Sequence, residues 1–168
     1  QVDGIVAASV ALSSQLLDRC QNAGVPVVLF NRSQDLQSLS SVTSDNFRGG
    51  RKVAEFLLAT APNRIGYIAG WEGASTQRDR EFGFRQRLAE DGRDIDLRTI
   101  GNFHMESARQ ATLERFDRGD PPDAIFVAND HMAFAVMDTL RFELGLLVPH
   151  DVSVVGYDDV PTAAWRAY

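Results

Sequence analysis

Polar and aromatic side chains follow several of the short apolar runs in this chain of 168 residues. Each run is typical of a buried parallel strand, so the residues after it should lie at the carboxyl edge of a sheet, where open α/β sheets bind ligands. Amides and carboxylates bind hydroxyl pairs, arginine donates in a rigid fork, and aromatic faces cover a sugar ring. The mixture suits a polyhydroxylated ligand. The residues concerned are Asn31-Arg32, Asp45-Asn46, the segment 71–78, Asn102-Phe103, Asn129-Asp130 and Tyr157-Asp158-Asp159.

Each of these residues also has a purely structural explanation. Asp45 and Asp130 stand at predicted helix starts, where an N-cap role explains each at least as well. The pair Asp158-Asp159 could form a turn, Phe103 could belong to the core, and Trp71 could be an exposed loop aromatic. Their common position at one edge of the inferred sheet is what favours ligand binding.

Catalytic and metal chemistry find little support in the residue pattern. His104, His131 and His150 lie far apart without metal-binding spacing, so we expect no metal ion and no cofactor. The single cysteine, Cys20, falls in an apolar helical series, which favours packing over nucleophilic chemistry. Residues 70–76 resemble a phosphate loop but lack its Gly-Lys-Ser/Thr ending, and no G-x-S-x-G motif is present. The pattern favours a binding protein over an enzyme.

The charge balance argues against nucleic-acid binding by these residues. The chain has 17 basic and 23 acidic residues and a formal net charge of −6, whereas nucleic-acid binding needs a concentrated basic surface. Arg78, Arg80, Arg85 and Arg87 cluster, but interleaved acidic residues predict a solvated helix face with ion pairs. We expect no membrane span and no signal peptide, and a single cysteine fits a reducing compartment, which favours the cytoplasm.

Strands and helices alternate along the chain, which predicts an α/β fold with mainly parallel sheets. Apolar runs predict strands near residues 5–7, 25–30, 41–43, 65–69, 98–101, 124–128 and 152–155, three before Pro62 and four after it. Helical periodicity predicts helices near residues 12–23, after Asp45, and near 78–90, 108–116 and 130–144. A doubly wound lobe with three strands would be small, so we expect the first lobe to be incomplete in this chain.

In their order and spacing, these segments resemble the effector-binding core of LacI/GalR transcription regulators, a type I periplasmic-binding-protein fold. The most specific piece is residues 148–159, Val-Pro-His-Asp-Val-Ser-Val-Val-Gly-Tyr-Asp-Asp. The resemblance implies two doubly wound parallel-sheet lobes, with residues 1–46 as a partial first lobe, 47–160 as the second and 161–168 as the start of a crossover. Other matching pieces are residues 3–6 and 25–32, Asp45-Asn46 with Gly49-Gly50, residues 64–70, residues 75–78 with Gly83-Phe84, and residues 128–130.

The resemblance also implies which residues would contact an effector. Arg78 would bind effector hydroxyls or a carboxylate, Asn129 and Asp158 would be the further polar contacts from the second lobe, and Phe103 would stack on the ligand. From the first lobe, Asn31 and Asp45 would face the ligand, although many family members have Asp where this chain has Asn31. Residue Glu72 would lie in the loop that tunes specificity, where its charge disfavours an anionic effector.

For the whole protein, the resemblance implies a homodimer that binds operator DNA under the control of a small metabolite, most simply a sugar. Phe134 and Trp165 match positions near the dimer contact, although core packing explains Phe134 equally well. The DNA-binding headpiece of such regulators is not expected in this chain. Two alternatives stay open, a periplasmic sugar-binding protein of a transport system and an enzyme on a doubly wound scaffold.

Overall fold

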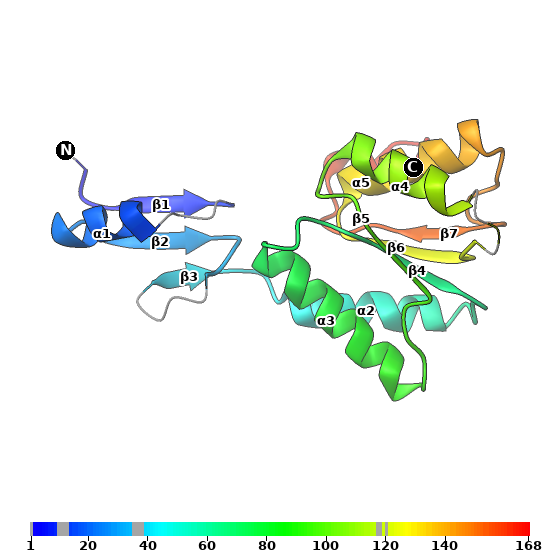
Figure 1. Cartoon of the computed structure of the whole chain (residues 1–168), viewed down its shortest axis with the longest axis horizontal. Coiled ribbons are helices and arrows are strands. Elements are labelled where there is room, and N and C mark those ends of the chain that lie inside the picture. Colours follow the sequence, from blue (N-terminus) through cyan, green and yellow to red (C-terminus); the bar gives the residue numbers. More distant parts are fainter. Residues whose placement is uncertain (1, 10–13, 35–38, 117–118, 120) are drawn as a thin grey trace.

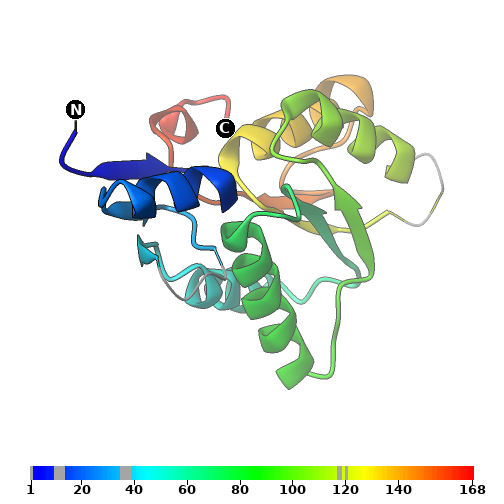
Figure 2. The ribbon, with the colours of Figure 1, turned by 60° about the vertical axis from the view of Figure 1, so that its left-hand side comes forward.

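A computed structural model describes residues 2–9, 14–34, 39–116, 119 and 121–168 of the chain. The first part of the chain forms a parallel sheet of three strands in the order β1-β2-β3, namely β1 (Ile5–Ala8), β2 (Val27–Phe30) and β3 (Ser40–Val42). Helix α1 (Ser14–Asn22) joins β1 to β2 and covers one face of this sheet in both views (Figures 1 and 2). Residues 12 and 13 of the predicted first helix lie outside the described residues.

The second sheet is also parallel and contains β4 (Ile65–Ala69), β5 (Leu97–Ile100), β6 (Ala124–Val127) and β7 (Ser153–Val155). Its strand order is β5-β4-β6-β7, so the chain moves to one side of β4 and then returns to the other side. The gap between the ends of β4 and β6 is therefore a topological switch point, the usual ligand position in such sheets. The predicted α/β class, with parallel sheets of three and four strands, is confirmed.

Helices cover both faces of the second sheet (Figure 1). On one face α2 (Asn46–Leu58) packs against α3 (Ser75–Glu90), and on the other α4 (Met105–Phe116) packs against α5 (Asp130–Asp138). Under α2 and α3, the rings of Tyr67, Phe84 and Phe126 lie 5.0–5.9 Å apart and are almost fully buried. This aromatic cluster fixes α3 against the centre of the sheet.

Two glycines allow α2 and α3 to approach each other closely. A Cβ atom on Gly50 would lie 2.0 Å from the carbonyl oxygen of Arg80, and one on Gly83 would lie 2.0 Å from that of Phe47. Any larger side chain would push the two helices apart. Because α2 packs on α3, it belongs with the second sheet, and the predicted division after residue 46 falls at its first turn.

Some element boundaries differ from the sequence prediction. Helix α3 begins at Ser75 rather than residue 78, and the predicted helix 130–144 changes after Asp138 into a π-helical segment, Thr139–Glu143. A short 3-10 helix, Pro161–Ala164, follows β7. None of the helices in the described ranges combines the length and apolar character that crossing a bilayer requires.

Candidate functional site

The carboxyl ends of the two sheets face each other. In Figure 1 the arrows of β1 and β2 point toward the second sheet, and that of β7 points back toward the first. The backbone at these ends is unusual, because six residues that lie one to four positions after a strand have left-handed φ angles between 54° and 116°. Such conformations cost about 1–3 kcal/mol each in residues other than glycine and cluster at ligand sites. These residues are Ser9, Asn31, Asn102, Phe103, Asp158 and Asp159.

Arg80 lies at the centre of this edge, and its side chain is only 7% exposed. Its Nη1 donates to the carbonyl oxygen of Ala128 at the end of β6 (2.6 Å), and its Nε donates to Oδ1 of Asn46 (2.8 Å). Its Nη2 donates to Oδ1 of Asp158 after β7 (3.0 Å). The guanidinium also lies 3.7 Å from the ring centre of Tyr157, within cation–π range. One side chain thus joins α2, α3 and the ends of two strands.

Asp158 is the carboxylate that this arginine orients. Partial burial raises the pKa of Asp158 above its ordinary value, and the charge of Arg80 opposes that rise. Nearby, Asp130 accepts a hydrogen bond from the amide of Val160 (2.9 Å) and donates its own amide to the carbonyl of Tyr157 (2.9 Å). A hollow at the surface is lined by Asp130, residues 156–159 and Ala163. Carboxylate oxygens at its wall can accept hydrogen bonds from ligand hydroxyls.

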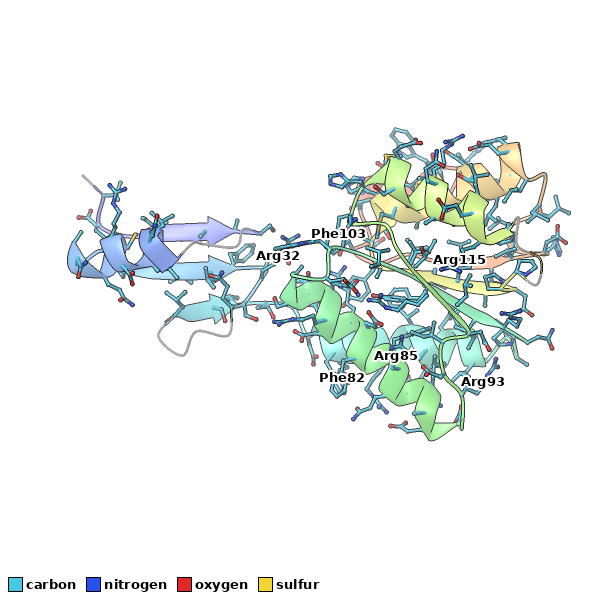
Figure 3. The ribbon with its side chains drawn as sticks, viewed as in Figure 1. Arg32, Phe82, Arg85, Arg93, Phe103 and Arg115 are labelled. Carbon is cyan, nitrogen blue, oxygen red and sulfur yellow. The ribbon has the colours of Figure 1, made fainter. Side chains whose placement is uncertain are left out.

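Aromatic rings line the other side of the edge. Phe103 lies on the backbone of Gly70, because a Cβ atom there would be 2.1 Å from the ring, and Trp71 lies in the same way on Gly73. Arg32 of the first lobe lies near Phe103 (Figure 3). Its Cζ atom is 5.6 Å from the centre of the Phe103 ring and 5.7 Å from that of Trp71. The arrangement provides flat apolar faces beside charged donors.

A hydrogen-bond network holds the loop between β4 and α3. Oε1 of the buried Gln77 accepts from the Gly70 amide (2.7 Å) and from the Tyr67 hydroxyl (2.8 Å). Gln77 donates to Glu81 (2.9 Å), and Arg98 of β5 binds both oxygens of Glu81 (2.7 and 2.9 Å). The same Arg98 donates to Glu72 in the loop (2.8 Å). The loop is therefore tied at both ends, to the helix and to the neighbouring strand.

The structure corrects the prediction for the arginines of α3. The sequence placed Arg78, Arg80, Arg85 and Arg87 together on a solvated face, but Arg80 is buried. Only part of that prediction holds, since Arg85 pairs with Glu81 and Asp94, and Arg87 with Asp91. Arg80, rather than Arg78, binds Asp158 and the end of β6. Arg78 is exposed in the first turn of α3.

The predicted polar residues occupy several distinct places along the edge. Asn129 is buried and caps α5, since its Oδ1 accepts from the amide of Met132 (3.1 Å), so the prediction that Asp130 is the N-cap is wrong. Asp45 is exposed and caps α2 by accepting from the amide of Arg48 (2.9 Å). Asn31 donates to the Ser9 hydroxyl (2.7 Å) across the ends of β2 and β1.

Phe134 and Trp165, the predicted dimer-contact residues, differ in exposure. Phe134 is buried, and its ring centre lies 4.3 Å from that of Tyr168 in the same chain. Tyr168 is held by Asp138, which accepts a hydrogen bond from its hydroxyl (3.2 Å). Trp165 is 63% exposed. Packing within the chain thus accounts for the position of Phe134 and leaves Trp165 at the surface.

Sequence reasoning missed Arg80 as a residue of this edge, and it placed Arg32 and Gln77 at the edge without assigning either a contact. A signal for Arg80 was present, because Arg80, Phe84 and Leu88 are spaced four apart and share one helix face. Apolar residues at this spacing face the core, so the same pattern places Arg80 on the buried side with Phe84 and Leu88. No periodic pattern marks Arg32, which follows a strand and lies in no helix.

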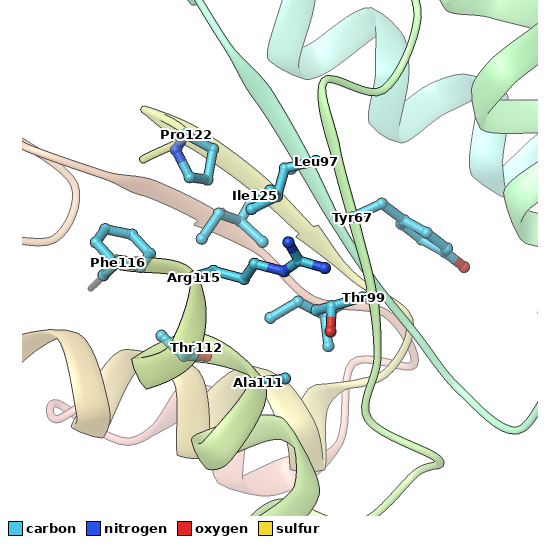
Figure 4. A pocket seen from close by; sticks show the side chains of 11 residues that line it. Tyr67, Leu97, Thr99, Ala111, Thr112, Arg115, Phe116, Pro122 and Ile125 are labelled. Carbon is cyan, nitrogen blue, oxygen red and sulfur yellow. The ribbon is translucent and has the colours of Figure 1, made fainter. Parts of the chain in front are cut away.

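Other features of the described residues do not compete with this edge as a site. A small hollow lies between α4 and the sheet, lined by Leu97, Thr99, Thr112, Arg115, Phe116, Ile125 and neighbours (Figure 4), and has room for no more than about one water molecule. Among the residues described, no three His, Cys, Asp or Glu side chains are grouped so that they could hold a metal ion.

Comparisons with known proteins agree with this architecture. A family model described as a periplasmic binding protein domain matches residues 1–165. The HTH-type transcriptional regulator CelR of Thermobifida fusca is 36% identical over 166 residues, which cover 96% of this chain and 48% of that protein. The HTH-type transcriptional repressor PurR of Photobacterium profundum is 30% identical over 168 residues, which cover 98% and 50%. The chain therefore spans about half the length of the curated relatives it matches.

A solved structure, that of a transcriptional regulator CelR–cellobiose complex, has a TM-score of 0.88 to this chain at 36% identity. The match covers 96% of this chain and 50% of that one. The chain belongs to the periplasmic binding protein domain family, and its relatives within that family are LacI-type transcriptional regulators.

Proposed function

We propose that the chain is part of the ligand-sensing core of a LacI/GalR-type transcriptional regulator. The observation that carries this proposal is the edge where the two parallel sheets face each other, at which charged, amide and aromatic side chains follow successive strands. The names of the curated relatives support a regulator over a transport protein, since CelR and PurR are both HTH-type regulators. They also support binding over catalysis, and a cytoplasmic location follows from that role.

The effector would lie between the two sheets. Asp158, oriented by Arg80, would accept hydrogen bonds from ligand hydroxyls, and Phe103 would cover an apolar ring face. Arg78 in the first turn of α3 would donate from its exposed guanidinium. Of the other predicted residues, Asn129 also caps α5 through its Oδ1, and its amide nitrogen would donate to a ligand.

From the first lobe, Asn31 and Asp45 complete the proposed set. Asn31 follows β2 and lines a hollow with Phe30 and residues 42–44. Asp45 lines another hollow with Arg48, Lys52 and Tyr157. Both are already engaged in hydrogen bonds within the chain, Asn31 with Ser9 and Asp45 with the first turn of α2. A ligand that binds them would therefore share or replace these hydrogen bonds.

A sugar or a similar small polar metabolite is the proposed effector. The solved complex of CelR with cellobiose supports a carbohydrate. Glu72 should disfavour an anionic effector less than its charge alone suggests, because Arg98 pairs with this carboxylate at 2.8 Å. Uronates therefore belong among the compounds to test, together with neutral sugars.

Control of DNA binding would follow from the two-lobe design. An effector that bridges the lobes favours one relative orientation, and in a homodimer that orientation would set the spacing of two DNA-binding headpieces. Coupling free energies of this kind are typically about 1–3 kcal/mol, which corresponds to roughly 5–150-fold changes in affinity for the operator.

A thermal-shift screen of the full-length protein tests the proposal. The panel contains cellobiose, glucose, galacturonate, adenosine and guanine, and we expect one chemical class to raise the melting temperature. For the compound that does so, Asp158→Asn should weaken binding by at least about tenfold, or about 1.4 kcal/mol. The matched control is Asp18→Asn, the same change at an exposed position of α1. Equal affinity of Asp158→Asn and the parent protein would overturn the assignment, and so would a panel without any stabilising compound.

A further inference from the structure

Arg32 extends from the first lobe to the second. It follows β2 and Asn31, whose φ of 72° turns the chain out of the strand direction. The next residue, Ser33, donates its amide to Oγ of Ser75 at the first position of α3 (2.9 Å). This hydrogen bond joins a segment after the first sheet to a helix of the second lobe. It holds the backbone of Arg32 beside the aromatic side of the edge.

The guanidinium of Arg32 contacts two rings that arise from different strands. Its distances of 5.7 Å to the centre of Trp71 and 5.6 Å to the centre of Phe103 are both within cation–π range. Trp71 follows β4 and Phe103 follows β5, and each ring lies against a glycine backbone, at Gly73 and Gly70. The guanidinium of Arg32 is therefore a contact that both rings share.

The polar environment of Arg32 is sparse. Its Nε atom is buried, and no hydrogen-bond partner for it is found among the described residues. Burial lowers the pKa of Arg32, and the charge of Arg80 lowers it further, but arginine remains charged in proteins. A cation in such a place is stabilised by the faces of aromatic rings.

We propose that Arg32 is a positioning residue that holds Trp71 and Phe103 in place and joins the two lobes before any effector binds. The contact is made entirely by residues of this chain, so it does not depend on the identity of an effector. Its relevance to effector binding rests on the proposed function. Without Arg32, the two rings lose their common contact and the Ser33–Ser75 hydrogen bond opens more often.

The test uses the full-length protein without effector, labelled with 5-fluorotryptophan. The fluorine resonance of Trp71 is assigned by its loss in Trp71→Phe. Arg32→Met keeps most of the side-chain length but removes the charge, and Arg32→Lys keeps the charge but removes the planar fork. The control is Arg19→Met, at an exposed position of α1 in the same lobe. The second readout is hydrogen exchange at the Ser33 amide, measured by fragmentation mass spectrometry.

Arg32→Met should move the Trp71 resonance and leave the Trp165 resonance in place, which shows that the variant is folded. The Ser33 amide should exchange roughly 2–5-fold faster, the equivalent of about 0.5–1 kcal/mol for a partly exposed cation–π contact. Arg32→Lys should fall between Arg32→Met and the parent protein, and Arg19→Met should match the parent protein. The proposal is overturned if Arg32→Met leaves the Trp71 resonance and the Ser33 exchange rate at their parent values. Because no effector is added, this result is independent of the sugar screen.

Discussion

Replacing Arg80 tests the centre of the site. The guanidinium makes hydrogen bonds to Asn46, to the carbonyl of Ala128 and to Asp158, at 2.6–3.0 Å, and it lies on the ring of Tyr157. In Arg80→Met the volume of the side chain is largely kept, but all three acceptors lose their donor. We therefore expect the variant to fold with the same architecture and to be markedly less stable.

The size of the loss follows from the burial of the partners. Removing one member of a buried, hydrogen-bonded charge pair costs about 3–5 kcal/mol. Asp158 retains 36% of its side-chain exposure, so water can replace part of the lost interaction. The carbonyl of Ala128 and the buried Asn46 have less access to water. Together these considerations predict a loss of about 3 kcal/mol in the free energy of unfolding.

Urea unfolding at neutral pH measures this loss, with the slope of the transition as a check that both proteins unfold in the same way. Arg78→Met is the matched control, the same substitution two residues earlier on the same helix at an exposed position. It should stay within about 0.5 kcal/mol of the parent protein. A loss below about 1 kcal/mol for Arg80→Met would refute the view that Arg80 organises the edge.

Three further predictions concern packing, pH and capping. Gly50→Ala and Gly83→Ala should each lower the free energy of unfolding by about 1–3 kcal/mol, because the added Cβ would lie 2.0 Å from a carbonyl oxygen. Urea unfolding measures this loss, and Gln86→Ala, on the exposed side of α3, is the control. A variant as stable as Gln86→Ala would contradict the prediction. Burial raises the pKa of Glu81, but hydrogen bonds from arginine outweigh it and hold that pKa below its ordinary 4.5. The ionised Glu81 therefore stabilises the fold above the unfolded-state pKa, and this contribution is lost as pH falls through the folded pKa. In Glu81→Gln the free energy of unfolding should fall less steeply below about pH 4.5 than in the parent protein. An equally steep fall in both proteins would argue against this. Asn129→Ala should cost about 1 kcal/mol and Asn129→Asp much less, since aspartate can also cap α5; equal losses in urea unfolding would show that the cap is unimportant.

Much of the fold could be predicted because buried segments are recognisable in the sequence as runs of apolar residues. Runs such as residues 65–69 and 124–127 are buried along their whole length, so they are apolar without alternation and mark central strands of a parallel sheet. The positions of Asn31, Phe103 and Asp158 followed from other apolar runs, which predicted the strands that precede these residues. The ends of the helices predicted near residues 12–23 and 78–90 were equally clear, because a glycine follows each of them, and Gly24 and Gly92 both adopt the positive φ of a helix end.

The details of the site could not be predicted in the same way. The spacing of Arg80, Phe84 and Leu88 indicates that Arg80 turns inward, but its contact with α2 depends on Gly50 and Gly83, which allow the two helices to approach closely. The left-handed backbone at Phe103 has no signal in its residue type, because bulky residues rarely adopt it. Asn129 and Asp130 are both good capping residues, and only the geometry shows that Asn129 caps α5.

The most direct test of the account is hydrogen exchange of the full-length protein with and without the compound that gives the largest rise in melting temperature. We predict slower exchange in the segments after the strands, at residues 31–33, 71–80, 102–103, 129–130 and 157–159, with little change at the opposite ends of the strands. Protection confined to other parts of the chain, with these segments unchanged, would contradict the proposal that the edge between the two sheets binds the effector.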